Sequence, residues 1–428
     1  MGAKKQSSAA RFNSLAPRVA ATGQCWRGQE MLAGGARREK TFVVNAMFRP
    51  LIPIIALLLV SACGHSISVG GSGSPPLPPP GPEFAYVTNS GDDLISGFSI
   101  DHKTGALGTP KTIAAGTASG LLGLAATGSG KFLYAANPAD NKVYGFKINQ
   151  TTGVLSPTAQ GSVDTGAGTA PSTLAVSPGS QYLYVVDSAK DQLFSYSITA
   201  SSGALKAIGS GPIGTGQEPV SIAISPRGGA LFVANLGDGN IEGYAIAKDG
   251  TLSETGLIDS LGTAPGEPQW LVADPSGAAL YDADALGGSG GSISAFNIAG
   301  VTLSFLGLFA TGNLANLPLS ATVSPTLPLV YAANGANNNL SQYQITGSGL
   351  SSATLVPGVP SANSIIADQS GKFVYVTDQS DAMVFQFAIN QTNGNLTPIG
   401  SGSVDTESPA NGTSAPFQVI TVAEPAPG

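Results

Sequence analysis

A short phrase recurs seven times along this 428-residue chain at nearly constant spacing. Each copy begins with Tyr or Phe and ends with Asn or Asp, and the copies begin 48, 50, 48, 49, 50 and 44 residues apart. A fixed period of this length indicates a repeat fold rather than a set of unrelated domains. The seven phrases are Tyr86–Asn89, Tyr134–Asn137, Tyr184–Asp187, Phe232–Asn235, Tyr281–Asp284, Tyr331–Asn334 and Tyr375–Asp378.

Each period carries the signals of four strands. An apolar run that ends in a turn precedes most phrases, as in Leu174–Gly179. An aromatic-x-Ile segment follows each phrase, and its two-residue spacing puts both side chains on one face of a strand. A Gly-containing turn typical of a hairpin comes next. Four antiparallel strands per period form a propeller blade, so the repeats predict an all-β, seven-bladed β-propeller.

The first blade lacks its apolar strand, because the residues before it are rich in Gly, Ser and Pro. A matching strand occurs instead at the C-terminal end, at Phe417–Val422. We therefore expect this C-terminal strand to join the first blade and close the ring, which removes free sheet edges. The predicted propeller spans residues 84–423, and residues 424–428 form a tail.

Residues 47–62 resemble a lipoprotein signal peptide, with a short basic start, the apolar run Leu51–Val60 and small residues before Cys63. The segment Val60–Cys63 resembles a bacterial lipobox, so Cys63 is the predicted lipidation site and residues 63–83 are the tether. The alternative is an ordinary signal peptide with an incidental cysteine. Residues 1–46 are expected to be a non-globular extension, from either a start codon assigned too far upstream or a long basic leader. The predicted location is the bacterial cell envelope, with a lipid anchor.

The charge of the predicted propeller excludes some classes of partner. From Phe84 onward the chain has 10 basic and 23 acidic side chains, a net charge of −13. Such a body repels phosphate backbones and anionic lipid heads, so we expect no nucleic-acid partner and membrane contact only through the anchor. Both cysteines precede this region, which therefore has no disulfide or thiolate nucleophile. A monomer is expected.

The repeats resemble those of the lactonase-like seven-bladed propellers, whose Tyr-Val-Thr-Asn phrase stands verbatim at Tyr86–Asn89. The resemblance covers residues 84–423, and it implies lactone hydrolysis, because the family includes 6-phosphogluconolactonases. Its enzymatic members resemble one another in His and Arg near the start of inner strands. Here the matching segment reads Glu267-Pro268-Gln269-Trp270. The only histidine of the predicted propeller is His102 and its only arginine is Arg227; both are expected in surface turns.

The last residue of each phrase is the first candidate for ligand binding. These side chains are predicted to form a ring around the central channel, where their oxygens would suit a hard cation such as Ca²⁺ or a sugar. The alternative is structural, because Asn and Asp also cap turns. The ring consists of Asn89, Asn137, Asp187, Asn235, Asp284, Asn334 and Asp378.

Glu218 and Glu267 are the candidate catalytic residues, because each precedes Pro at the start of a predicted inner strand. Paired carboxylates there would bind a metal or act as acid and base, whereas the structural alternative is two solvated loop acids. Phosphate is usually held by Arg or Lys, and this face offers only Lys142 and Lys190, which disfavours a phosphorylated lactone.

The missing His and Arg favour a binding module for a sugar, peptide, protein or cation over an enzyme. The alternative is a lactonase for uncharged lactones, assisted by a metal at Glu218 and Glu267. No cofactor is required in either interpretation, and a divalent cation such as Ca²⁺ is the one candidate.

Overall fold

The computed structural model describes residues 81–117, 119–258, 266–285, 290–312, 316–406 and 415–423. The predicted N-terminal extension, the signal peptide, Cys63, most of the tether and the C-terminal tail lie outside the described residues.

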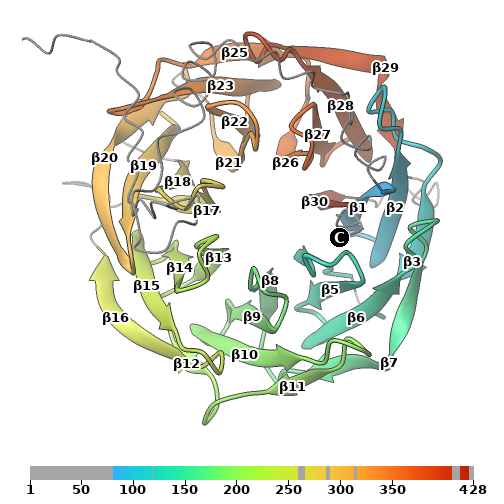
Figure 1. The fold of residues 1–428 in the computed structure, drawn as a ribbon, viewed down its shortest axis with the longest axis vertical. Helices are drawn as coiled ribbons and strands as arrows, with labels where there is room; N and C mark the ends of the chain where they lie inside the picture. Colours follow the sequence, from blue (N-terminus) through green and yellow to red (C-terminus); the bar gives the residue numbers. More distant parts are fainter. Residues whose placement is uncertain are drawn as a thin grey trace, which may run out of the picture. The chain divides into compact units, whose positions relative to one another are not determined.

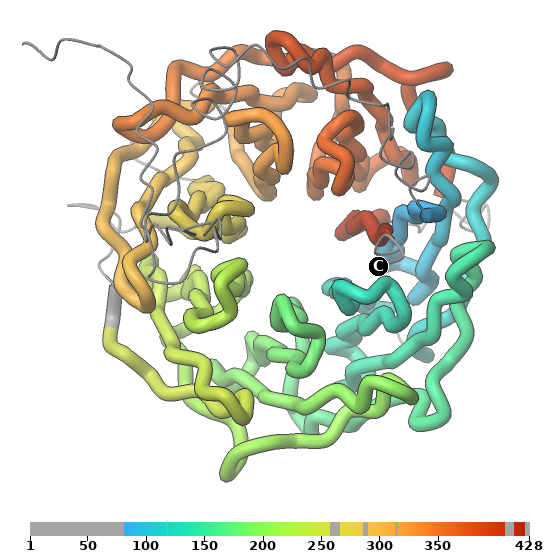
Figure 2. Tube along the Cα trace, viewed as in Figure 1, coloured from blue at the N-terminus to red at the C-terminus, as the bar shows by residue number. Residues whose placement is uncertain are grey.

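Every regular element of the described residues is a strand, and the strands form seven antiparallel sheets arranged as the blades of a ring (Figures 1 and 2). From the inner to the outer strand, blade 1 consists of β30 (Pro416–Ala423), β1 (Glu83–Asn89), β2 (Leu94–Ile100) and β3 (Lys111–Ala114). Blade 2 consists of β4 (Leu124–Ala126), β5 (Phe132–Asn137), β6 (Lys142–Ile148) and β7 (Leu155–Asp164). Blade 4 consists of β13 (Pro219–Ile224), β14 (Ala230–Asn235), β15 (Asn240–Ile246) and β16 (Leu252–Ile258).

Blades 5 and 7 have the same four-stranded order. Blade 5 consists of β17 (Pro268–Ala273), β18 (Ala279–Asp284), β19 (Ser292–Ala299) and β20 (Thr302–Ala310). Blade 7 consists of β26 (Ala362–Ala367), β27 (Phe373–Asp378), β28 (Met383–Ile389) and β29 (Leu396–Asp405).

Blades 3 and 6 differ only in their outer strand, which is interrupted. Both pieces of each interrupted strand still pair with the third strand of the blade, so the four-stranded layout is kept. Blade 3 consists of β8 (Pro171–Val176), β9 (Tyr182–Asp187), β10 (Gln192–Ile198) and the pieces β11 (Leu205–Ala207) and β12 (Ile213–Gly214). Blade 6 consists of β21 (Pro318–Val323), β22 (Leu329–Asn334), β23 (Asn339–Thr346) and the pieces β24 (Gly349–Leu350) and β25 (Thr354–Pro357).

The C-terminal strand closes the ring, as the sequence predicts. Strand β30 pairs antiparallel with β1, with Glu83 opposite Ala423 and Val87 opposite Val419, and Figure 1 shows the two strands side by side. Val419 packs in the cluster between blades 7 and 1, whereas Val422 packs between blades 1 and 2. The last strand therefore contributes to two blade interfaces as well as to its own sheet.

In five of the blades the recurring Tyr joins its blade to the next one. Its ring is fully buried, and its hydroxyl donates a hydrogen bond to the carbonyl of a turn glycine in the following blade, as from Tyr134 to Gly203 (2.9 Å). Two residues earlier, the Phe132 ring lies against the same glycine. Because a Cβ would have no room there, this glycine is needed for close approach as well as for its positive φ. The five pairs are Tyr86–Gly153, Tyr134–Gly203, Tyr184–Gly250, Tyr331–Gly394 and Tyr375–Gly105.

Candidate functional site

The antiparallel blades give the ring two faces with different turns. We call the channel face the one formed by the turns between second and third strands and by the segments that lead into the inner strands. The opposite face carries the turns between first and second strands and between third and fourth strands. The sequence-predicted ring and both candidate glutamates belong to the channel face, whereas His102 and Arg227, which follow β2 and β13, lie on the opposite face.

The seven Asn and Asp side chains of the predicted ring are fully buried. Three of them accept hydrogen bonds from amides of the turns that they begin: Asp187 Oδ1 accepts the amide of Ala189, and Asp378 Oδ1 accepts the amide of Ser380. Asn137 Oδ1 likewise accepts the amide of Ala139. These contacts are those of turn caps. Direct ligand binding by the ring stays a prediction.

A second set of carboxylates in the same turns fixes the segments that lead into the inner strands. Asp93 of blade 1 accepts the Gly120 amide (3.0 Å) at the start of blade 2. Asp191 of blade 3 accepts the Glu218 amide (2.9 Å) at the start of blade 4 in the same way. Asp238 of blade 4 adds a bond from the neighbouring Gln217 amide. The rim of the channel face is therefore held by charge-assisted hydrogen bonds across blade boundaries.

The structure places Glu218 and Glu267 at equivalent positions of neighbouring blades, immediately before β13 and β17, whose strands are in contact. The Glu218 side chain is exposed and its backbone is in the left-handed region, with a φ of +50°. A non-glycine residue in this region is uncommon and marks a locally constrained position. Glu267 is partly exposed, and its amide donates to Asp284 Oδ1 (3.2 Å). Both glutamates thus have a fixed backbone on the channel face.

Acidic side chains outnumber basic ones on this rim. Among the described residues of the turns between second and third strands and of the segments before the inner strands, the one basic side chain is Lys190, whose Nζ donates to Ala167 O. Lys142 stands at the start of β6, just beyond such a turn. The rim therefore attracts cations and repels phosphate. Its acids are Asp92, Asp93, Asp140, Asp191, Glu218, Asp238, Glu267 and Asp381.

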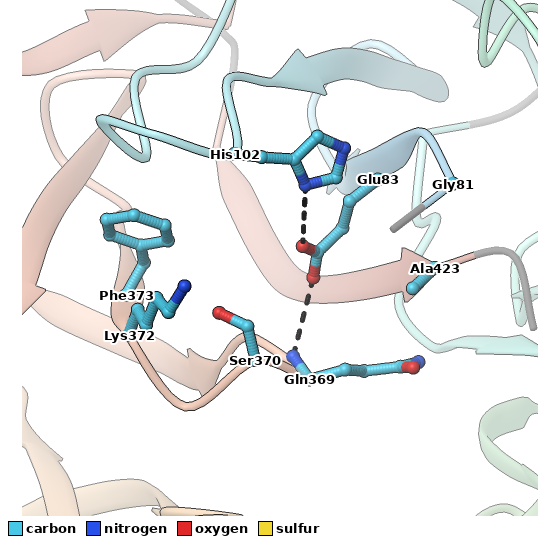
Figure 3. Close-up of a pocket in the computed structure, with 8 residues that line it drawn as sticks. All are labelled: Gly81, Glu83, His102, Gln369, Ser370, Lys372, Phe373 and Ala423. Atoms are coloured by element: carbon cyan, nitrogen blue, oxygen red, sulfur yellow. Dashed lines mark hydrogen bonds and ion pairs between the residues drawn. The ribbon is translucent and has the colours of Figure 1, made fainter. Parts of the chain in front are cut away.

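A pocket of about 230 Å³ lies on the opposite face, where blades 7 and 1 meet (Figure 3). Glu83, at the start of β1, points into this pocket; its Oε2 lies 3.9 Å from His102 Nδ1, and its Oε1 accepts the Gln369 amide (3.4 Å). Ser370 and Lys372 also line the pocket. The sequence patterns do not reveal this site, since they place Glu83 at the end of the predicted tether, whereas it begins β1, and its partners are distant in the chain.

Burial raises the pKa of Glu83 to about 7, and the neighbouring Asp368 carboxylate contributes to the rise, while the Gln369 amide acts against it. This carboxyl therefore keeps its proton to a higher pH than an ordinary glutamate does. The Glu83 side chain is only 5% exposed at the pocket wall.

We expect the Glu83 shift to make stability depend on pH. Because the folded state binds the proton more tightly than the unfolded state, the free energy of unfolding should fall by on the order of 2 kcal/mol as pH rises from about 4.5 to 7. The neighbouring Asp368 carboxylate contributes to this fall, because it disfavours the ionised Glu83 carboxyl. The measurement is urea unfolding at several pH values in this range.

The matched variants are Glu83→Gln, which removes the titration, and Glu254→Gln, which removes an exposed carboxylate of β16. The slope of stability against pH should be shallower in Glu83→Gln than in the unmodified protein and unchanged in Glu254→Gln. Equal slopes in all three proteins would show that Glu83 titrates at its ordinary pKa.

The described residues show neither a histidine- or carboxylate-rich metal cluster nor a membrane-spanning helix. No group of three or more His, Cys, Asp or Glu side chains there has an arrangement suited to a metal ion. In the same part of the chain, no helix is long and apolar enough to cross a membrane.

Comparisons with known proteins agree with this architecture. Residues 80–169 and 160–265 match the family described as lactonase, 7-bladed beta-propeller. A solved periplasmic gluconolactonase from Pseudomonas aeruginosa is 17% identical, with a TM-score of 0.65 over 80% of this chain and 99% of the other. A Bacteroides fragilis protein described as a candidate 6-phosphogluconolactonase is 20% identical, with a TM-score of 0.65 over 80% and 98%. No curated protein matches. Identities this low establish the fold alone: the chain is a seven-bladed β-propeller whose residues 80–265 are similar to the lactonase family.

Proposed function

We propose that this protein is a binding propeller whose channel face takes a neutral or positively charged ligand, such as a sugar or a cationic peptide segment. The observation that carries the proposal is the acidic rim, which the Asp93 and Asp191 carboxylates hold in place across blade boundaries. A rim of fixed acceptors lowers the ordering cost of binding polar ligands. The histidine and arginine of the described propeller lie on the opposite face, so Lys190 is the one group among the described rim residues of the kind that usually holds phosphate.

Isothermal titration of the purified protein with a lysine-rich peptide, a neutral oligosaccharide and a phosphorylated sugar tests the proposal. The peptide or the oligosaccharide should bind, the phosphorylated sugar should not, and added salt should weaken peptide binding. Glu218→Gln and Glu267→Gln should each reduce affinity several-fold, whereas Glu254→Gln on an outer strand should leave it unchanged. Selective binding of the phosphorylated sugar would contradict the proposal.

Hydrolysis of uncharged lactones is the second candidate function, supported by the family match of residues 80–265. In this case one rim carboxylate, Glu218 or Glu267, would accept a proton from water as the water attacks the lactone carbonyl, and a metal held there would polarise that carbonyl. Turnover of a neutral lactone that falls at least tenfold in either Gln variant would support this function. Unchanged turnover in both variants would remove these residues from the reaction.

For the location, we propose export and lipid anchoring through Cys63, on the basis of the lipobox-like segment Val60–Cys63. The Cys63→Ser variant should leave the detergent-soluble membrane fraction, whereas the unmodified protein should stay in it. Equal partitioning of the two proteins would contradict the anchor.

A further inference from the structure

Four polar side chains form a buried patch on the face of blade 5 that packs against blade 4. Asp282 and Asp284 come from β18, and Ser292 and Ser294 come from β19. The strand register puts Asp282 directly opposite Ser294 and Asp284 directly opposite Ser292, and directly opposed side chains share one face of a sheet. All four residues are at most 2% exposed.

The carboxyl of Asp282 occupies a position that is apolar in the other six blades. Its neighbours along the same strand face, Leu280 and the paired Phe296, pack against Phe232 and Ala234 of blade 4. An acid in such an interface is costly unless it is paired or coordinated. The equivalent residues are Val87, Ala135, Val185, Val233, Ala332 and Val376.

Blades 1 and 6 show how a serine at the position of Ser294 is normally satisfied. In blade 1, Asn89 Nδ2 donates to Ser96 Oγ (2.9 Å), and this hydroxyl donates to a carbonyl of blade 7. In blade 6, Asn334 Nδ2 donates to Ser341 Oγ (2.8 Å) in the same way. Both arrangements depend on the amide group of the preceding Asn.

Blade 5 has Asp284 in place of that Asn, and a carboxylate has no hydrogen to donate. No hydrogen bond of normal geometry reaches either oxygen of Asp282 or the hydroxyls of Ser292 and Ser294 within the described residues. The patch therefore gathers oxygen atoms without the donor that blades 1 and 6 supply. In blades 5 and 7, the segment after the outer strand provides the carbonyl that accepts the serine hydroxyl of the next blade. The corresponding segment of blade 4 follows β16 and falls within residues 259–265, outside the described residues.

The charge of the patch also lacks compensation at Asp282, which forms no ion pair with a side chain of the described residues. Burial and the nearby Asp284 carboxylate disfavour the charge of Asp282, while the Trp270 and Gln269 backbone amides offset part of this cost. Two states remove the cost of this buried charge: a proton on Asp282, or a cation shared by the oxygens of the patch.

We propose that Asp282, Asp284, Ser292 and Ser294 bind a hard metal cation of the Ca²⁺ class between blades 4 and 5. Carboxylate and hydroxyl oxygens are the donors that such ions prefer, and Ca²⁺ accepts irregular sets of six to eight oxygens. The site is distinct from the glutamate pair of the channel face. It is connected to that face, because Asp284 also holds the Glu267 amide at the start of β17, so an occupied site would fix the segment that carries Glu267.

The first test is calcium binding by the chelator-treated protein, measured by isothermal titration and by the melting temperature. One equivalent of Ca²⁺ should bind and raise the melting temperature by several degrees, since a ligand at 100 times its Kd stabilises the folded state by about 2.7 kcal/mol. Mg²⁺ and Na⁺ at the same ionic strength should give smaller shifts. Absence of binding by the unmodified protein would overturn the proposal and assign Asp282 as a buried neutral acid.

Matched variants test whether Ca²⁺ binds at these four residues. Asp282→Asn should lose Ca²⁺ binding yet melt, without calcium, at or above the temperature of the unmodified protein, because its buried carboxyl is gone. Ser294→Ala, which keeps both carboxylates, should weaken binding at least tenfold, and Glu254→Gln should bind normally. Tb³⁺ in the site should show luminescence excited through Trp270, and Asp282→Asn should abolish it. Full calcium binding by both Asp282→Asn and Ser294→Ala would contradict the assignment.

Discussion

Removal of residues 416–428 is expected to abolish the cooperative unfolding of this protein and to leave an aggregating chain. The truncation deletes β30, which pairs with β1 and contributes Val419 and Val422 to two blade interfaces. It also exposes the inner edge of β1 and opens the ring between β26 and β4, both of which contact β30. A propeller without disulfides has no covalent link to replace this closure, and unpaired strand edges promote aggregation.

The measurement is thermal unfolding together with size-exclusion chromatography. A chain ending at Ala423 keeps β30 and should melt as the unmodified protein does, which separates the effect of the strand from that of the last five residues. A monomeric truncation at Ala415 that still melts cooperatively would show that three strands suffice for blade 1.

The Gly203→Ala variant is expected to lose about 3 kcal/mol of unfolding free energy. A methyl group on Gly203 would overlap the ring of Phe132 in the preceding blade, and an L-residue at its φ of +73° is also strained. Overpacking of a buried contact costs about 1 to 3 kcal/mol, and the left-handed conformation costs about 1 kcal/mol more. The methyl would in addition displace the carbonyl that accepts the Tyr134 hydroxyl.

Gly300→Ala is the matched control, because Gly300 lies in the corresponding turn of blade 5 with a φ of +68°, and a Cβ added there would meet no atom within 4 Å. This variant should lose only about 1 kcal/mol, the cost of the backbone conformation alone. Urea unfolding of both variants therefore measures the blade contact as a difference of about 2 kcal/mol. Equal losses of unfolding free energy in the two variants would mean that the Phe132 ring moves aside without destabilising the protein.

The sequence predicted only part of the candidate site. Glu218 and Glu267 could be placed at the starts of inner strands because Pro and the repeat period mark those positions. The burial of the Asn and Asp ring could not be read from the phrase, since a turn cap and an exposed ligand use the same residue types. Asp282 did carry a sequence signal, an acid where the other six copies have Val or Ala, but its meaning needed the blade interface.

The sequence by itself determined the seven blades, their four-stranded order and closure by the last strand, because these follow from local strand patterns repeated at one period. Only the tertiary structure decided which side chains meet across blade boundaries. Glu83 faces His102 and Gln369, and Tyr134 reaches Gly203, through pairings of residues far apart in the chain. Such contacts depend on the ring geometry and on burial, and neither quantity is encoded in the spacing of a local pattern.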